Sequence, residues 1–286
     1  MTSGLLVIDK PAGITSFAVV AAVRKNTAIK KVGHAGTLDP MATGILVVAL
    51  GRATRLIRYV QESDKEYRAT IQFGIATDSL DADGVETERV PMSFDREALE
   101  EALETFRGQV SQIPPMVSAL KVGGERLYDL ARAGKEVERE ARQVLVSVLE
   151  VVDFEPRAGF PIATVRVVAS KGTYVRTLAD DIARTLGGRA HLTALRRLRI
   201  GRFGVAEAIS LEALSDWQEH LRLPAEAVSD LAPWLIDSAE AAAVRSGRSL
   251  PAAIGEGPWA MLAEADNLLG VYRRDADRAV AEVVLA

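Results

Sequence analysis

The spacing of hydrophobic positions predicts a chain that alternates irregularly between strands and helices. Apolar runs and period-two alternation predict strands at residues 4–9, 45–51, 65–74, 142–155, 161–170 and 188–202. Apolar positions three or four residues apart predict helices at 17–28, 53–61, 95–108 and 172–188. Asp95 is the expected N-cap of the third helix, and Gly108 is its expected stop. Because the order has no regular βαβ rhythm, we predict an α+β domain around a mainly antiparallel central sheet.

Two segments depart from this pattern. Residues 112–142 hold paired prolines, paired glycines and mixed charge between two sheet segments, as is typical of a mobile functional flap. Beyond residue 231, short apolar runs predict strands at 258–264, 268–274 and 279–285. A segment of about 55 residues is too small for an independent catalytic domain. We therefore predict two domains, a main domain at 1–231 and a small β-rich module at 232–286.

Composition narrows the possible chemistry. The 286 residues contain no cysteine, which excludes disulfides, thiolate catalysis and cysteine-ligated metals and agrees with a reducing cytoplasm. The three histidines lie far apart without HExxH spacing, so we expect no metal cofactor. No run approaches the roughly 20 apolar residues of a spanning helix, and the N-terminus lacks the features of an export signal. The sequence predicts a soluble cytoplasmic protein with no membrane partner.

Charge is segregated along the chain. The net charge of −4 argues against a nucleic-acid partner, because phosphate binding usually leaves a basic footprint. However, residues 188–202 carry five arginines and no acid, and a local basic track is enough to bind a polyanion. Residues 78–88 are strongly acidic. An EF-hand aligned there would place Ser79 and Val90 at positions one and twelve, so we interpret this stretch as a solvated turn.

The segment 31–46, KVGHAGTLDPMATGIL, surrounds Asp39 with residues that bend the backbone. Gly33, Gly36 and Gly44 permit positive φ or close approach to a ligand, and Pro40 keeps Asp39 out of the helical region. These features predict a carboxylate on a rigid, extended loop. Two interpretations stay open on spacing alone: Asp39 accepts hydrogen bonds from turn amides, or it is catalytic. The segment matches neither phosphate-binding glycine pattern.

Several segments together resemble one family. In order they are LLVIDKPAGITS, KVGHAGTLDPMATGILVVALGRATRL, KEYRATIQFGIATDSLDADG, IPPMVSALKVGGERLYDLARAGKEVEREAR, SKGTYVRTLADDIA and AHLTALRRLRIGRF. They resemble the motifs of the TruB family, bacterial enzymes that convert uridine 55 of the tRNA TΨC loop to pseudouridine. The resemblance implies the pseudouridine synthase fold, a thumb-like flap at about 112–142 and a PUA-like RNA-binding module at 232–286. It implies no cofactor.

The same resemblance assigns three catalytic residues. Asp39 matches the family's catalytic aspartate, which attacks the target nucleoside or, on another view, promotes glycosidic cleavage. Arg176 matches the arginine that pairs with this aspartate and opposes the rise in its pKa on burial. Tyr67 matches a tyrosine that stacks on the flipped base. The ordinary alternatives are a solvated helix arginine for Arg176 and a buried strand tyrosine for Tyr67.

Further residues are assigned to RNA binding in the same way. His34 matches a histidine that packs against bases displaced from the tRNA loop. Lys10 supports the turn near the active site or touches a phosphate, and Leu195 resembles an apolar wall of the pocket. Arg196 and Arg197 face phosphates or cap the sheet. One departure is Val117, which stands where many relatives have an aromatic residue after PPM, and we expect it to alter flap packing.

We therefore predict a stand-alone, monomeric tRNA pseudouridine(55) synthase that flips its target base and recognises the shape of the T-stem and loop. No lysine-rich tail suggests assembly with a guide RNA. A role in tRNA folding beside the chemistry stays open. Two other classes also stay open. One is a glycosidase that pairs Asp39 with Asp180 or Asp181, and the other is a tRNA-binding protein without catalysis.

Overall fold

The computed structural model describes residues 2–116, 121–122, 125–126, 130, 135, 137–252, 255–263 and 267–285. Its helices are α1 (Ser16–Thr27), α2 (Ile57–Glu62), α3 (Arg96–Glu104), α5 (Val175–Thr185) and α6 (Ser238–Arg245), with 3₁₀ helices η1 (Gly51–Leu56), η2 (Val205–Glu207), η3 (Glu212–His220) and η4 (Pro224–Val228). Its strands are β1 (Gly4–Lys10), β2 (Val32–His34), β3 (Thr43–Leu50), β4 (Lys65–Phe73), β5 (Ile75–Thr77), β6 (Glu86–Arg89), β7 (Gly108–Gln112), β8 (Lys121–Val122), β9 (Glu125–Arg126), β10 (Arg142–Glu155), β11 (Ile162–Ala169), β12 (Ala190–Ile200), β13 (Phe203–Gly204), β14 (Ala232–Leu235), β15 (Leu250–Pro251), β16 (Trp259–Leu262), β17 (Leu268–Asp275) and β18 (Arg278–Val284).

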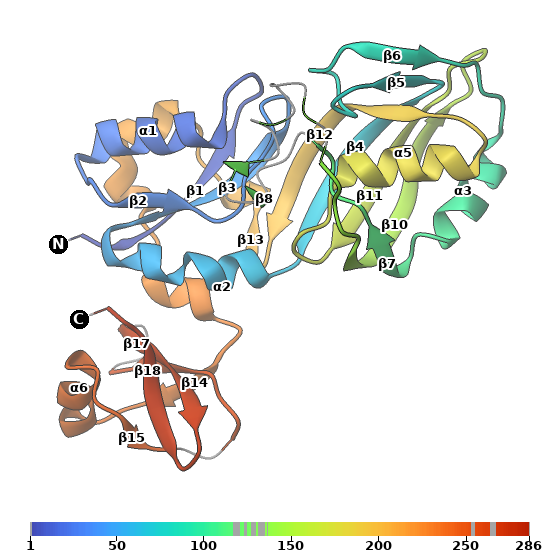
Figure 1. Ribbon diagram of the computed structural model, residues 1–286. Coiled ribbons are helices and arrows are strands. Elements are labelled where there is room, and N and C mark those ends of the chain that lie inside the picture. The colour runs from blue at the N-terminus through green and yellow to red at the C-terminus, as the bar shows by residue number, and fades with distance from the viewer. Residues whose placement is uncertain are drawn as a thin grey trace.

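A nine-stranded sheet forms the centre of the main domain (Figure 1). Its strand order is β1-β3-β12-β4-β11-β10-β7, with β2 added on β3 and β13 on β12. Among the described residues, β12 and β3 form the one parallel pair of this sheet, and the other neighbours are antiparallel. The predicted α+β class with a mainly antiparallel sheet is confirmed. The parallel pair joins the two halves of the sheet.

Helices α1 and α5 lie on the same side of this sheet, over its two different halves (Figure 1). Helix α1 packs Val19 and Val23 against alternate residues of β1 and β3. Helix α5 packs against β4, β10, β11 and β12, together with α3. Asp95 caps α3 as predicted, but the predicted stop at Gly108 is wrong. The helix ends at Glu104, and Gly108 takes a φ of +83° at the start of β7.

The C-terminal residues form a separate five-stranded sheet in the order β14-β16-β17-β18-β15. The three predicted strands are present as β16, β17 and β18, and sequence analysis missed β14, β15 and α6. This sheet lies beside η1 and α2, and its hydrophobic residues share one core with the main domain (Figure 1). Arg52 Nη1 donates to the Leu285 carbonyl at 2.8 Å across this contact. The β-rich C-terminal module is therefore packed on the main sheet.

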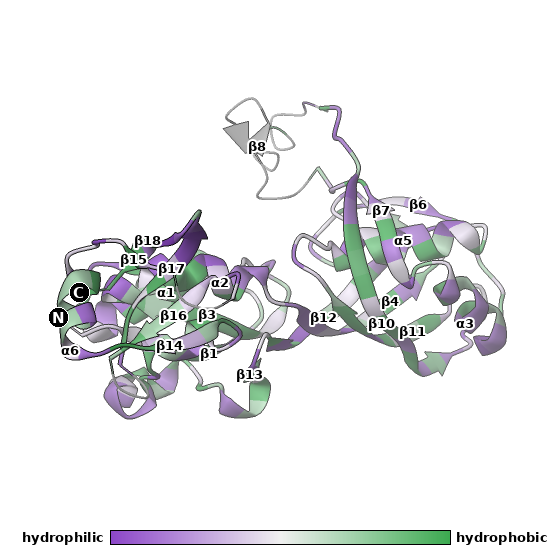
Figure 2. Cartoon of the chain, turned by 90° about the horizontal axis from the view of Figure 1, so that it is seen from below, coloured by the Kyte–Doolittle hydropathy of each residue, from purple (hydrophilic) through white to green (hydrophobic). Residues whose placement is uncertain are grey.

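Hydrophobic residues concentrate along the buried strands of both sheets (Figure 2). Seven of the eight residues of β3 are buried. The segment predicted as a flap leaves the sheet at β7 and returns at β10, which are adjacent strands. Val117 and nearly half of this segment lie outside the described residues. Within the described ranges, no helix is long and apolar enough to cross a bilayer.

Gly44 lies where the two halves of the sheet meet, opposite Arg197 in the parallel pair of β3 and β12. Its φ is +98°, and an added Cβ would lie 2.2 Å from the carbonyl oxygen of Arg197. We expect Gly44→Ala to lower the free energy of unfolding by about 3 kcal/mol or more, because strain and a backbone clash add. Gly13 is the control, since its φ is +82° but an added Cβ meets no atom within 4 Å. Denaturant unfolding of both variants checks this, and equal losses would contradict the clash.

Candidate active site

The loop that carries Asp39 is held from both sides. Gly36 takes a φ of +93°, and the carbonyl of Asp39 accepts a hydrogen bond from the Ala42 amide at 3.1 Å. On the other side, the Ser16 hydroxyl accepts from the Leu38 amide at 2.9 Å and donates to the Leu38 carbonyl at 3.1 Å. Ser16 is the first residue of α1. The start of this helix therefore fixes the backbone immediately before Asp39.

Arg176, in the first turn of α5, binds the carboxylate of Asp39 with two nitrogens. Nη2 donates to Oδ1 at 3.1 Å, and Nε lies 3.0 Å from Oδ2. Its third nitrogen, Nη1, donates to Asp81 Oδ2 at 3.0 Å and to the Ser79 carbonyl at 2.9 Å. Because Arg176 is 4% exposed, it is not the solvated helix residue of the alternative interpretation. One planar guanidinium thus joins two carboxylates in fixed geometry.

The acidic stretch 78–88 contributes to this network, which corrects its interpretation as a solvated turn. Asp81 is 3% exposed, and its Oδ1 accepts hydrogen bonds from the Ser79 hydroxyl and from the Asp83 amide at 3.1 Å. The end of the stretch is exposed, as predicted. Composition gave no signal for the burial of Asp81, because an acid-rich turn has the same composition with or without a buried arginine beside it.

Burial controls the pKa of Asp39. Loss of water around the carboxyl group raises its pKa above the ordinary value of 3.8, and the charges of Asp81 and Asp83 add to this rise. The Arg176 guanidinium opposes it and favours the ionised form. The site therefore holds a partly desolvated carboxylate against a permanent cation.

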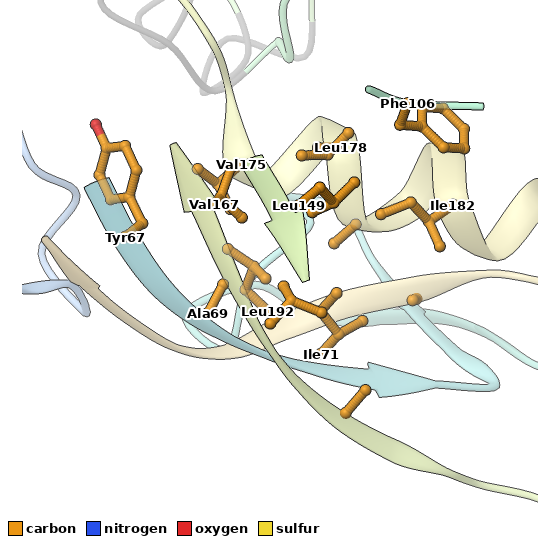
Figure 3. Close-up of a cluster of buried hydrophobic side chains, with 14 of the residues drawn as sticks. Tyr67, Ala69, Ile71, Phe106, Leu149, Val167, Val175, Leu178, Ile182 and Leu192 are labelled. Atoms are coloured by element: carbon orange, nitrogen blue, oxygen red, sulfur yellow. The ribbon is translucent and has the colours of Figure 1, made fainter. Parts of the chain in front are cut away.

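A cavity of about 320 Å³ opens beside this ion pair. Its lining comes from four segments: Gly36, Thr37, Leu38 and Asp39; Lys65 and Tyr67; Gly172, Thr173, Tyr174, Val175 and Arg176; Leu195 and Arg197. Tyr67 ends a row of buried side chains on β4, and its hydroxyl points away from that cluster (Figure 3). Tyr67 and Leu195 are 8% and 7% exposed and supply an apolar wall. This combination suits a planar ring placed beside a carboxylate.

Lys10 is enclosed by backbone. Its Nζ donates to the carbonyls of Pro11, Ile14 and Pro40 at 3.0, 2.8 and 3.1 Å, and no part of the residue is exposed. Burial lowers its pKa to about 8. This geometry matches the turn-supporting alternative for Lys10, because the ammonium group is surrounded by carbonyls and does not face a phosphate. Through Pro40 it holds the residue after Asp39.

Arg197 has a similar role on the other side of the loop. It is 1% exposed, and its guanidinium donates to the carbonyls of Ile45 at 2.7 Å and Gly36 at 3.1 Å. It therefore caps the backbone where β3 meets the loop that carries Asp39, and the buried guanidinium is not on the surface where phosphates would lie. Arg196 points to the opposite face of the sheet and pairs with Asp9 at 2.6 Å.

His34 ends β2 and lies outside the residues that line the cavity. Its Nδ1 is buried without a hydrogen-bond partner. Burial and the nearby Arg197 charge lower its pKa, which favours the neutral ring. Its contact with displaced bases stays a prediction.

Lys65 and Tyr174 are among the cavity residues that sequence analysis did not single out. Lys65, two residues before Tyr67 on β4, donates to the carbonyls of Gln61 and Ser63 at 2.6 Å, and burial lowers its pKa to about 8. The backbone of Tyr174 exchanges two hydrogen bonds with the buried Gln112 side chain at the end of β7. Both residues stand inside the resembling motifs KEYRA and KGTYVR, which were the available signal.

The arginines of residues 188–202 do not form the free basic track that their sequence suggests. Each member that is half-buried or exposed faces an acid from another element: Arg189 with Asp180 and Glu88, Arg196 with Asp9, Arg199 with Glu66, and Arg202 with Glu226. Asp180 forms ion pairs with Arg184 and Arg189 and is absent from the cavity lining. Asp181 is absent from the lining as well, which disfavours the glycosidase alternative that pairs Asp39 with either of these two acids.

Two family models match successive parts of the chain. The model described as "TruB family pseudouridylate synthase (N terminal domain)" matches residues 24–175, and "tRNA pseudouridylate synthase B C-terminal domain" matches residues 176–233. The chain belongs to the TruB family. The boundary between the matches falls at the start of α5, inside the main domain. The five-stranded module follows the second match.

Curated relatives carry the same family name over nearly the whole chain. The tRNA pseudouridine synthase B of Symbiobacterium thermophilum is 49% identical over 245 residues, which are 85% of this chain and 82% of the relative. The tRNA pseudouridine synthase B of Mycobacterium sp. (strain KMS) is 43% identical over 289 residues, covering 99% and 96%. This TruB-family chain is accordingly an isomerase that forms pseudouridine in tRNA.

Solved structures support the fold. A structure of an H/ACA ribonucleoprotein bound to a substrate RNA containing 2′-deoxyuridine has a TM-score of 0.76 at 26% identity, covering 99% of this chain and 85% of the neighbour. A Cbf5-Nop10-Gar1 complex has a TM-score of 0.77 at 27% identity, with the same coverage. The pseudouridine synthase fold predicted for this TruB-family chain is confirmed.

Proposed function

We propose that this protein converts uridine 55 in the TΨC loop of tRNA to pseudouridine, with Asp39 as the catalytic carboxylate. The observation that carries the proposal is the Asp39–Arg176 ion pair at the wall of a cavity whose apolar side is formed by Tyr67 and Leu195. The membership in the TruB family supplies the substrate class.

The dimensions of the site require an extruded base. A uridine stacked inside a folded loop cannot reach a carboxylate behind the entrance of the cavity, so the nucleotide must leave the stack. Unstacking costs a few kcal/mol, and stacking on an aromatic ring returns about 1 to 3 kcal/mol. The described lining holds two aromatic residues, Tyr67 and Tyr174, and the family resemblance assigns the stacking to Tyr67.

The chemistry rearranges bonds without a net gain or loss of atoms. The bond between C1′ and N1 breaks, the uracil turns, and a bond forms between C1′ and C5. N1 gains a proton and C5 loses one. Attack by Asp39 on the nucleoside and promotion of glycosidic cleavage both need the ionised carboxylate. Arg176 keeps that form available in a desolvated site.

The protein acts in this proposal without a guide RNA, as a cytoplasmic monomer. Support comes from the relatives, which are named as tRNA pseudouridine synthase B without mention of a guide RNA. The H/ACA structures share the fold but are ribonucleoprotein assemblies. Measuring turnover with purified protein and tRNA alone tests this part directly.

The substrate is tested with tRNA transcripts tritiated at uracil C5. Purified protein should release tritium without added metal or nucleotide, and replacement of uridine 55 by cytidine should abolish release at that site. Filter binding with both transcripts runs in parallel. Release that survives the replacement would assign a different target uridine. Binding without release would leave the RNA-binding alternative in place of catalysis.

The raised pKa of Asp39 predicts the acidic side of the pH profile. A carboxyl with a raised pKa is protonated at higher pH, so activity should fall as the pH decreases through a midpoint above the ordinary 3.8. Asp81→Asn removes a charge that raises this pKa, so its midpoint should lie at lower pH. Single-turnover rates between pH 4.5 and 8 check this, with circular dichroism to confirm folding. A midpoint shifted upward would contradict it.

A further inference from the structure

We propose that the exposed side of α1 and the loop after it bind the backbone of tRNA next to the extruded nucleotide. This α1 track consists of Phe17, Ala18, Ala21, Lys25, Lys30 and Lys31, all exposed. The inference rests on the proposed function in one respect, because it takes tRNA as the polyanion. It adds a binding surface beyond the cavity and beyond the arginines of residues 188–202.

The first argument is charge. Residues 10–38 contain no aspartate or glutamate. In the described part of the chain, no ion pair involves Lys25, Lys30 or Lys31. Residues 188–202 show the opposite, since their half-buried or exposed arginines all face acids. In a protein of net charge −4, the α1 track is therefore a place where phosphates meet uncompensated cations.

The second argument is position. Ser16 begins α1 and bonds both backbone groups of Leu38, which lines the cavity next to Asp39. The track thus starts beside the catalytic loop and follows a helix about 18 Å long. Helix α1 also lies on the same side of the sheet as α5, which supplies Arg176 (Figure 1). RNA that delivers a nucleotide to the cavity can continue along this helix.

The third argument is Phe17. Its side chain is 68% exposed, directly after Ser16, and it has no ring partner in the described residues. An exposed aromatic ring at the start of a basic track provides a stacking surface for an unpaired loop base. Ala18 and Ala21 follow on the exposed side and leave room for the backbone to approach the helix.

The neighbouring charges limit where the RNA can pass. The 3₁₀ helix η3 packs against α1 and carries exposed Glu212, Asp216 and Glu219. These acids repel phosphates from the η3 side. The loop that carries Lys30 and Lys31 continues instead into β2, which ends at His34. The track therefore joins the catalytic loop to the predicted base contact of His34 by one continuous route.

The test compares two charge-matched triple variants by tRNA binding at several salt concentrations. Lys25→Gln, Lys30→Gln and Lys31→Gln together should reduce the slope of log affinity against log salt by about 2 to 3 and weaken binding by roughly 10-fold or more. The control combines Arg89→Gln, Arg96→Gln and Arg157→Gln, three exposed arginines remote from α1 in sequence, and should leave the slope unchanged. Single-turnover rates at saturating tRNA should stay within about twofold of the unsubstituted protein for both.

Phe17 is tested separately. Phe17→Ala should weaken tRNA binding by about 5-fold or more, and Phe17→Trp should restore it, because both aromatic rings stack on bases. Val152→Ala, on β10 and 45% exposed, is the apolar control. An unchanged salt slope in the lysine variant, or equal affinity of Phe17→Ala, would overturn the α1 track. If the slopes change as expected but uridine 55 releases no tritium, the track stands and the proposed target fails.

Discussion

Asp39→Asn is expected to abolish pseudouridine formation while tRNA binding persists. The amide keeps the size of the side chain and a hydrogen-bond acceptor for Arg176, but it carries no charge and is a poor nucleophile. The single-turnover rate should fall by on the order of 10⁴-fold or more, as for the loss of a catalytic nucleophile. Tritium release under rapid quench measures the rate, and filter binding measures affinity.

The same substitution separates the chemical role of Asp39 from a structural one. Burial raises the pKa of Asp39, so the ionised carboxylate is disfavoured by the folded site. Removing that charge should therefore leave the melting temperature unchanged or raise it by a few degrees. Protein that lost activity because it unfolded would instead melt lower. Retention of more than about one hundredth of the rate would reject Asp39 as the catalytic group, and the folded, inactive variant also provides a test of any role in tRNA folding.

Local patterns predicted the elements because the relevant forces act between near neighbours. The alternation in KEYRATIQF corresponds to β4, and Asp95 caps α3 through its own third-neighbour amide. The predicted end of α3 at Gly108 was wrong, because the positive φ of Gly108 serves the turn into β7 and the helix ends earlier, at Glu104. Three strands were predicted in the segment after residue 231, but its short helix α6 was missed. This helix is rich in alanine and has no strong apolar period.

The site was predicted less completely, because its residues meet through contacts distant in sequence. The resemblance assigned Asp39, Tyr67, Arg176 and Leu195 to one site, and in the structure all four line the same cavity. The burial of Asp81 depends on Arg176, 95 residues away. In the same way, the arginines of residues 188–202 look free in the sequence because their acidic partners lie on other helices and strands. A run of like charges in the sequence therefore does not by itself predict a free charged surface, because distant segments of the fold can supply the opposite charges.

Arg176→Met is expected to combine a large loss of activity with a large loss of stability. The substitution leaves Asp39 and Asp81 close together in a desolvated site without their shared cation. Removing one member of a buried ion pair costs about 3 to 5 kcal/mol of unfolding free energy. The rate should fall by on the order of 10³-fold, because the pKa of Asp39 rises further and the carboxylate loses its orientation.

The control is Arg184→Met on the same helix. Arg184 pairs with Asp180 at 3.0 Å, but its side chain is 56% exposed, and Asp180 also binds Arg189. This pair should contribute about 1 kcal/mol or less. Equal destabilisation of the two methionine variants in denaturant unfolding would show that the buried network does not hold the site together.

A second substitution distinguishes the two roles of Arg176. Adding Asp81→Asn to Arg176→Met removes one of the two carboxylates left without a cation, so a large part of the lost stability should return. Activity should stay low, because Asp39 still lacks the guanidinium that orients it and favours its charged form. Raising the pH should recover part of the rate in Arg176→Met, since a higher pKa for Asp39 moves its ionisation to higher pH. A pH-independent loss would mean that orientation alone, and not charge, is what Arg176 supplies to Asp39.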